Sequence, residues 1–377
     1  MSAWPDKYVI GLTGNIATGK SVVRKMLEHL GAYGIDADAL GHRAIARDAP
    51  GYRPVVETFG KWILGADGQI DRSKLARVVF ADPDALNRLE GIIHPLVRQA
   101  VDLLIKRSAQ KVIVVEAIKL LEGPLRQACD TIWVTYAAKQ TQIKRLTKKR
   151  GLSVAVAHQR VNSQAPQSEK VAAANIIITN EGSFEDTWQQ VTRAWKELFP
   201  TFDSGIFKPI IAPKGVLLVE KARPRHAAEI AALISRLSDG RKKPSADDIM
   251  AAFGEKAFLF LKLDEIPVGV VGWQVENLVE RTDDVYIDPG QPLSEAMKAL
   301  LTEIETTSRD LQCEVALLFL RPELTTQEEV WMSLGYEMCT VESLGVRAWQ
   351  EAAEETMEKG EAMFFKQLRK DRVLRPV

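Results

Sequence analysis

Short apolar runs alternate with stretches of helical periodicity along the first two hundred residues of this 377-residue chain. In the runs most of the four or five positions are apolar, whereas between them apolar residues recur every three or four positions. Strands that alternate with helices in this way predict a parallel, doubly wound α/β sheet. The runs that we interpret as strands are residues 8–12, 32–35, 112–115, 131–135 and 175–179.

The pattern changes after residues 200–215, which contain three prolines and two glycines. Beyond them the elements follow the order β-α-α-β-β-β-α-β-α, which predicts a mixed α+β domain. We therefore expect one domain over residues 1–200, a linker over 201–215 and a second domain over 216–377. The predicted strands of the second domain are residues 216–221, 257–263, 268–275, 284–287, 315–320 and 362–368, and its predicted helices are 224–237, 246–253, 293–308 and 325–334.

The composition narrows the class of protein. Fifty Lys and Arg balance fifty Asp and Glu, so no net field draws the chain to nucleic acid or to an anionic membrane. No apolar run approaches the roughly twenty residues of a membrane helix, and no apolar leader precedes the first strand. Cys129, Cys313 and Cys339 stand far apart, which indicates reduced thiols. We expect a cytoplasmic protein with neither a membrane nor a nucleic-acid partner.

The segment GLTGNIATGKS, residues 11–21, has the spacing of a phosphate-binding loop and lies between a predicted strand and a predicted helix. Gly14 and Gly19 allow backbone torsions that turn successive N–H groups towards phosphate oxygens. Lys20 can reach the β- and γ-phosphates, and the hydroxyl of Ser21 can bind Mg²⁺. We therefore expect ATP and Mg²⁺ to be bound by this loop, through Gly14, Asn15, Ile16, Ala17, Thr18, Gly19, Lys20 and Ser21.

Acidic residues follow the second and third predicted strands, at the sheet edge where such folds bind their ligands. Asp38 is the candidate base, because phosphoryl transfer to a hydroxyl needs a carboxylate that orients the hydroxyl and accepts its proton. Asp36 either caps the following helix or takes part in the site. Glu116 either holds a water of the Mg²⁺ shell or forms an ordinary salt bridge.

Basic residues are concentrated in residues 142–164, on two helical stretches that Gly151 separates. Such a hairpin is either a solvated charged face or a mobile lid. A lid closes over the phosphates, expels water and brings cations onto the group that is transferred. We predict a lid.

Over about residues 7–200 the chain resembles the dephospho-coenzyme A kinases. The motifs that carry the resemblance, in chain order, are GLTGNIATGKS, IDAD at 35–38, FGKWILGADGQIDRSKLARVVF at 59–80, IIHPLV at 92–97, RVNSQ at 160–164 and ITNEGS at 178–183. The resemblance implies a P-loop kinase that phosphorylates the ribose 3′-hydroxyl of dephospho-coenzyme A, giving coenzyme A and ADP in the last step of coenzyme A synthesis. By the same motifs, Lys20 would hold phosphates, Asp38 would be the base and Asn180 would lie near the adenine. The implied acceptor pocket contains Asp36, Phe59, Arg72, His94 and Glu116.

Two segments depart from the pattern of that family. Residues 116–122 read EAIKLLE where the family has aspartate-x-Pro-Leu-Leu-x-Glu, which places Lys119 beside the acceptor site. The family's lid arginine falls on Lys149, with Arg150 next to it, and a lysine lacks the planar fork of a guanidinium. We take Lys149 and Arg150 as candidate catalytic cations. Two alternatives stay open: a P-loop kinase for another small alcohol or nucleoside, and an inactive coenzyme-binding or assembly protein.

Residues 216–340 resemble the GNAT acetyltransferases in their element order and in the segments IPVGVVGWQV and WMSLGYE. That family binds the pyrophosphate of acetyl-coenzyme A through backbone N–H groups of a glycine-rich loop. Here the loop contains Asp288, Pro289 and Pro292, which bring a negative charge and remove N–H donors. Trp331 stands where a tyrosine acid is common. We expect a GNAT-like domain without acetyl transfer that serves in docking, dimerisation or regulation, and we leave the oligomeric state open.

Overall fold

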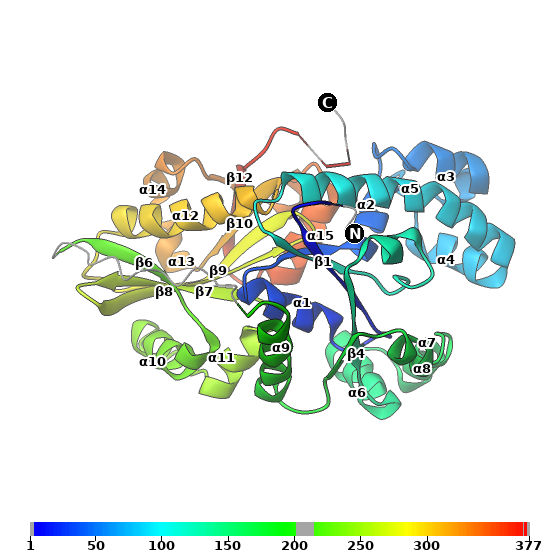
Figure 1. The fold of residues 1–377 in the computed structure, drawn as a ribbon. Coiled ribbons are helices and arrows are strands. Elements are labelled where there is room, and N and C mark those ends of the chain that lie inside the picture. Colours follow the sequence, from blue (N-terminus) through cyan, green and yellow to red (C-terminus); the bar gives the residue numbers. More distant parts are fainter. Residues whose placement is uncertain (1–3, 201–214, 372, 375–377) are drawn as a thin grey trace.

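The computed structural model of the chain describes residues 4–200, 215–371 and 373–374. They form two sheets, each covered by helices (Figure 1). We call residues 4–200 the N-terminal unit and residues 215–374 the C-terminal unit. The expected linker lies outside the described residues, apart from Gly215, and so do the side chains of Phe80, Lys149 and Arg150.

The sheet of the N-terminal unit has five strands in the order β2-β3-β1-β4-β5, and every neighbouring pair is parallel. The expected doubly wound α/β sheet is therefore confirmed. Its strands are β1 (Tyr8–Thr13), β2 (Tyr33–Asp36), β3 (Val112–Glu116), β4 (Thr131–Tyr136) and β5 (Ile176–Thr179). Because β1 lies between β3 and β4, the loop after β1 occupies the point where the strand order reverses, which is where such sheets bind ligands.

Helices cover both faces of this sheet. Successive side chains of a strand point to opposite faces, so Val9 packs against α2 and α5 whereas Ile10 packs against α1 and α9. Helices α3 and α4 and the start of α5 form an insertion that has a small core of its own. Helices α6 and α7 form the predicted basic hairpin. The helices are α1 (Lys20–His29), α2 (Ala37–Ala44), α3 (Tyr52–Phe59), α4 (Arg72–Ala81), α5 (Pro83–Arg107), α6 (Lys139–Arg150), α7 (Val154–Asn162), α8 (Gln167–Ala172) and α9 (Phe184–Leu198).

The sheet of the C-terminal unit is mixed, which confirms the expected α+β class. Its order is β11-β12-β10-β9-β8-β7-β6, with β9 and β10 parallel and the other neighbours antiparallel. The strands are β6 (Leu217–Lys221), β7 (Ala257–Leu263), β8 (Ile266–Glu276), β9 (Val279–Ile287), β10 (Val315–Leu320), β11 (Glu337–Cys339) and β12 (Ala362–Gln367).

Helix α12 covers one face of the mixed sheet, and α10, α11 and α15 cover the other. The predicted helix over residues 325–334 is wrong in its extent, because two shorter helices, α13 and α14, stand there. The helices of this unit are α10 (Ala227–Leu237), α11 (Ala246–Ala252), α12 (Leu293–Asp310), α13 (Pro322–Thr325), α14 (Glu328–Ser333) and α15 (Arg347–Thr356). Short 3₁₀ helices occur in both units, at Lys61–Ile63, Pro124–Ala128, Pro224–His226 and Val341–Ser343.

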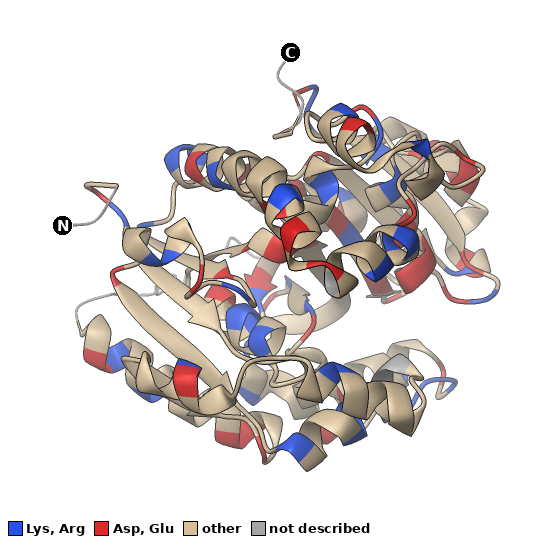
Figure 2. Cartoon of the chain, turned by 90° about the vertical axis from the view of Figure 1, so that its right-hand side faces the viewer, with Lys and Arg blue, Asp and Glu red and all other residues tan. Residues whose placement is uncertain are grey.

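Opposite charges are interspersed along the ribbon of both units (Figure 2), as the balanced composition leads one to expect. Among the helices of the described residues, none is both long enough and apolar enough to span a bilayer.

The two units pack against each other through the hairpin that joins β8 to β9. Asn277 and Leu278 form its tight turn, with φ of 52° and 63°, values typical of the two-residue turns that match strand twist. The side chain of Leu278 is buried in the core that α2 and α5 form with the parallel sheet. Around it, Tyr33 donates a hydrogen bond to the carbonyl of Leu311, and Arg43 pairs with Glu314 at 2.5 Å. The C-terminal unit therefore completes the core of the N-terminal unit.

Leu278→Ala tests this packing. We expect the substitution to lower the free energy of unfolding by about 2–3 kcal/mol, because it removes a buried side chain and leaves a cavity. Urea denaturation followed by circular dichroism measures the change. Met332→Ala is the control, since that side chain is 63% exposed. Equal midpoints for Leu278→Ala and the unaltered chain would contradict the packing.

Candidate active site

The loop after β1 has a backbone that only small residues tolerate at two points. Gly14 and Gly19 have φ of 155° and 92°, and Ala17 has φ of 58°. A Cβ atom on Gly14 would lie 2.3 Å from Oγ1 of Thr135, and one on Gly19 would lie 1.9 Å from Nδ2 of Asn180. The two glycines are therefore required by torsion and by close approach together.

Polar groups inside the loop hold it in shape. The Thr18 hydroxyl donates to the carbonyl of Asn15 at 2.8 Å and lies 2.7 Å from the hydroxyl of Thr135 on β4. The ammonium of Lys20, the first residue of α1, donates to the same Asn15 carbonyl at 3.4 Å. Lys20 is only 8% exposed. A buried cation at a helix N-terminus provides a binding site for an anion.

Asn180, just after β5, lies against this loop. Its Nδ2 atom donates to the carbonyl of Thr18 at 3.1 Å. Arg145 of α6 joins the two segments, because its guanidinium donates to the carbonyl of Ala17 at 3.1 Å and to that of Asn180 at 2.8 Å. The sequence analysis identified the basic hairpin but did not single out Arg145. Nothing in the sequence distinguishes Arg145 from the other basic residues of α6.

The hydroxyl of Ser21 donates to one oxygen of the Glu116 carboxylate at 3.0 Å. The other oxygen accepts from Nε of Arg24 at 2.8 Å. Both charged side chains are almost fully buried, at 4% and 5% exposure. Of the two expectations for Glu116, the salt bridge is therefore observed, and it brings the carboxylate to the phosphate-binding loop. Arg24 was not identified from the sequence, because one arginine inside an amphipathic helix has no distinctive spacing.

Asp36 and Asp38 stand at the end of β2 and in the first turn of α2. The carboxylate of Asp36 caps α2 by accepting from the Ala39 N–H at 2.8 Å. Burial and the nearby Glu116 carboxylate raise the pKa of Asp36. The carboxylate of Asp38 accepts from the backbone N–H of Ile118 at 3.0 Å. Burial raises the pKa of Asp38 as well, while the Ile118 hydrogen bond and the charges of Lys20 and Lys170 oppose the rise.

The backbone of Ile118 is held on both sides, two residues beyond β3. Its N–H binds Asp38, and its carbonyl accepts from Nζ of Lys170 at 2.6 Å and from the hydroxyl of Thr13 at 3.1 Å. Lys170, on α8, is 4% exposed, and burial lowers its pKa. Sequence reasoning missed Lys170, since it lies in a short polar helix that no motif marks.

The expected lid consists of α6 and α7, which pack on each other through Leu146, Ala157 and Val161. The segment that follows α7 contacts the phosphate-binding loop. The side-chain oxygen of Gln164 accepts from the N–H of Ile16 at 2.7 Å, and Asn15 donates to the carbonyl of Ala165 at 2.9 Å. Lys149 and Arg150 end α6, and their side chains lie outside the described part of the chain.

The residues expected in the acceptor pocket do not all lie together. Phe59 packs into the small core of the insertion, and His94 is half-buried on α5. Arg72, at the start of α4, forms an ion pair with Glu351 of α15 at 3.4 Å. Lys119, expected beside the acceptor, pairs with Glu90 of α5 at 2.5 Å. Asp36 and Glu116 belong instead to the cluster around Ser21 and Arg24.

Comparison with known proteins identifies the N-terminal unit. The family model described as Dephospho-CoA kinase matches residues 8–186. A dephospho-CoA kinase of Geobacter metallireducens is 43% identical over 192 residues, which cover 50% of this chain and 96% of the relative. A solved protein of Thermus thermophilus is 30% identical, with a TM-score of 0.46, and the match covers 51% of this chain and 98% of that one.

The chain is also similar to a solved protein of another family. An acetyltransferase of the GNAT family from Staphylococcus aureus is 12% identical, with a TM-score of 0.32 and coverage of 41% of this chain and 100% of that one.

One conclusion follows from the phosphate-binding loop, from the carboxylates beside it and from the match that covers 96% of the Geobacter relative. The chain belongs to the dephospho-CoA kinase family.

Proposed function

We propose that the chain transfers the γ-phosphoryl group of ATP to the ribose 3′-hydroxyl of dephospho-coenzyme A, giving coenzyme A and ADP. This is the last step of coenzyme A biosynthesis. The observation that carries the proposal is that Asp38 is held next to the start of the phosphate-binding loop: its carboxylate accepts from the Ile118 N–H, and the Ile118 carbonyl accepts from the hydroxyl of Thr13, the last residue of β1. The charge of Lys20, which lies in that loop, opposes the rise of the Asp38 pKa. A base and a phosphate-binding cation at one place are what phosphoryl transfer to an alcohol requires.

In this proposal the loop binds the nucleotide phosphates with its backbone N–H groups and the start of α1. Lys20 neutralises charge on the β- and γ-phosphates. Asn180 lies near the adenine in this proposal, which its hydrogen bond to the carbonyl of Thr18 in the loop supports. Arg145 of the lid helix α6 contacts the loop, because its guanidinium donates to the carbonyls of Ala17 and Asn180. Lys149 and Arg150 at the end of α6 supply further positive charge to the transferring group when the lid closes.

Asp38 acts as the base in this proposal. It orients the acceptor hydroxyl and takes its proton as the phosphoryl group moves. Its hydrogen bond to Ile118 fixes the carboxylate, since the Ile118 carbonyl is itself held by Lys170 and Thr13. Asp36 and Glu116 line the same edge, and Phe59, Arg72 and His94 belong to the insertion that receives the acceptor.

The residues present suit a magnesium ion that is bound largely through phosphates and water. Ser21 and Glu116 offer hard oxygen donors, which Mg²⁺ prefers. Among the described residues, no group of three or more His, Cys, Asp or Glu could hold a metal by itself. When bound, Mg²⁺ would neutralise the charge that develops on the phosphates. We assign the metal-binding hydroxyl to Ser21.

We further propose that the C-terminal unit is a GNAT-like domain, over residues 216–377, that transfers no acetyl group. Asp288 in its expected pyrophosphate loop accepts from the N–H of Gly290 at 3.0 Å and pairs with Arg236 at 3.0 Å. A carboxylate of the chain thus occupies a donor that a phosphate would need. Trp331, in the place of a tyrosine acid, is fully buried, and its indole N–H binds the carbonyl of Leu324.

We place the enzyme in the cytoplasm. The three cysteines are free thiols, which supports a reducing compartment.

Lys20→Ala tests the nucleotide site. We expect ADP formation that depends on dephospho-coenzyme A to fall by about 100-fold to 1,000-fold, because a preorganised cation is lost from the transition state. A coupled ADP-release assay measures the rate. Lys196→Ala is the matched control, since Lys196 is exposed on α9, and it should keep the full rate. A rate for Lys20→Ala within a few-fold of the unaltered enzyme would refute the proposal.

The pH dependence tests the base. Because burial raises the pKa of Asp38 above its ordinary value of 3.8, kcat/KM should fall as the pH drops through that raised pKa, where the base becomes protonated. Lys170→Met removes a charge that lowers this pKa, so the acid limb should move to higher pH. Lys196→Met should leave it in place. If Lys170→Met leaves the acid limb of the pH profile in place, the charge of Lys170 does not influence the ionisation of Asp38.

A further inference from the structure

We infer that the β8–β9 hairpin of the C-terminal unit positions the phosphate-binding serine of the kinase through a continuous chain of hydrogen bonds. The inference rests on the proposed function, because it assigns Ser21 to the nucleotide and its metal. The chain of bonds begins at a backbone carbonyl of β8 and ends at the Ser21 hydroxyl. Its intermediate members are Lys25, Glu28, Arg24 and Glu116.

Each link of this relay is a direct contact. Lys25 donates to the carbonyl of Val275 at 2.7 Å and to one oxygen of Glu28 at 2.9 Å. The other oxygen of Glu28 accepts from Arg24 at 2.6 Å. The Arg24 guanidinium then reaches Glu116 at 2.8 Å, and Glu116 accepts from Ser21 at 3.0 Å.

Burial makes the relay stiff. Arg24, Lys25 and Glu116 are 3%, 8% and 4% exposed, and the side chain of Glu28 is 22% exposed. A buried charge that loses its partner is strongly destabilised, so each side chain is restricted to the geometry that satisfies its neighbours. Burial opposes the charge of Arg24, yet the surrounding carboxylates of Glu28, Glu116, Asp36 and Glu276 raise its pKa. Because the members share hydrogen bonds, they cannot relax independently of one another.

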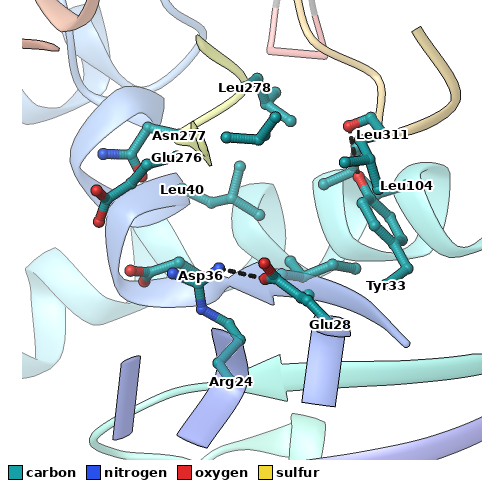
Figure 3. A pocket seen from close by; sticks show the side chains of 13 residues that line it. Arg24, Glu28, Tyr33, Asp36, Leu40, Leu104, Glu276, Asn277, Leu278 and Leu311 are labelled. Atoms are coloured by element: carbon teal, nitrogen blue, oxygen red, sulfur yellow. Dashed lines mark hydrogen bonds and ion pairs between the residues drawn. The ribbon is translucent and has the colours of Figure 1, made fainter. Parts of the chain in front are cut away.

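The C-terminal unit supplies the outer end of the relay in a fixed place. Leu278, at the hairpin tip, is seated in the core of the N-terminal unit, and Arg43 donates to the carbonyl of Asn277. These contacts anchor the residues that flank the Val275 carbonyl. Glu276, which Arg281 holds at 2.8 Å, and Arg24 line the same small cleft, of about 40 Å³. Figure 3 shows Glu28, Arg24 and Asp36 below this hairpin.

This outer end lies outside the part of the chain that matches the family. The match ends at residue 186, and the Geobacter relative is covered almost completely by 192 residues. The carbonyl of Val275 therefore has no counterpart in that match. In this chain the second unit has become part of the support of the nucleotide site, and Lys25, Glu28 and Arg24 are positioning residues.

Lys25→Met in the full chain tests the inference, because it keeps the aliphatic stem and removes both hydrogen bonds of the ammonium. Isothermal titration calorimetry measures ADP binding with and without Mg²⁺. We expect the affinity for ADP in the presence of Mg²⁺ to fall about fivefold, with little change in its absence. We expect kcat to fall with it, and the KM for dephospho-coenzyme A to stay constant. Lys25→Arg, which restores a donor, should recover most of the affinity.

Tyr33→Phe is the matched control. It removes a hydrogen bond between the same two units, from Tyr33 to the Leu311 carbonyl (Figure 3), that is not joined to the relay. It should leave ADP binding unchanged. Glu28→Gln breaks the next link and should reproduce the Mg²⁺-specific loss, which keeps the test decisive if Lys25→Met does not fold by circular dichroism.

Two results would overturn the inference. One is unchanged binding in both relay variants. The other is an equal loss in Tyr33→Phe and Lys25→Met, which would mean general damage to the contact between the units. If the unaltered chain binds ADP but does not phosphorylate dephospho-coenzyme A, the proposed function fails while the binding experiment still tests the relay.

Discussion

The buried carboxylate of Glu116 is the constraint around which the nucleotide site is built. At the end of β3 it is removed from water, so its charge has to be compensated by nearby donors. Arg24 and the Ser21 hydroxyl provide that compensation, and both lie on α1. The pair therefore ties the helix that begins at Lys20 to the centre of the parallel sheet. The loop of residues 14–19 spans the short distance between β1 and that helix, which leaves its backbone little freedom.

The turn after β3 has the same role for the candidate base. Its backbone amide at Ile118 holds the Asp38 carboxylate, while Lys170 and Thr13 hold its carbonyl. A backbone group fixed from three elements is a more rigid partner than a long side chain. This explains how the chain keeps its site geometry without the proline of the family pattern at position 118. The strand end and these three hydrogen bonds restrain the turn.

Local patterns were sufficient for the parallel sheet and the phosphate-binding loop, because apolar strand runs and the Gly-x₄-Gly-Lys-Ser spacing are signals of adjacent residues. They were insufficient where distant segments meet. Arg24, Arg145 and Lys170 reach the site from three helices, and an isolated basic residue in a helix has no distinctive pattern. Strand β9 begins five residues earlier than predicted, at Val279, because it contains buried polar residues, Glu280 and Thr282 among them, that obscure an apolar run. The roles of the individual site residues stay predictions.

Because Leu278 packs in the core between α2 and α5, this core can be completed only late in the synthesis of the chain on the ribosome. Synthesis proceeds from the amino end, and domains generally fold as they emerge. Here the first two hundred residues leave the exit tunnel with an unfilled depression in their interior, which closes only after β8 and β9 have been made. The apolar side chains around Leu278 are therefore fully covered only after the downstream sequence has been translated.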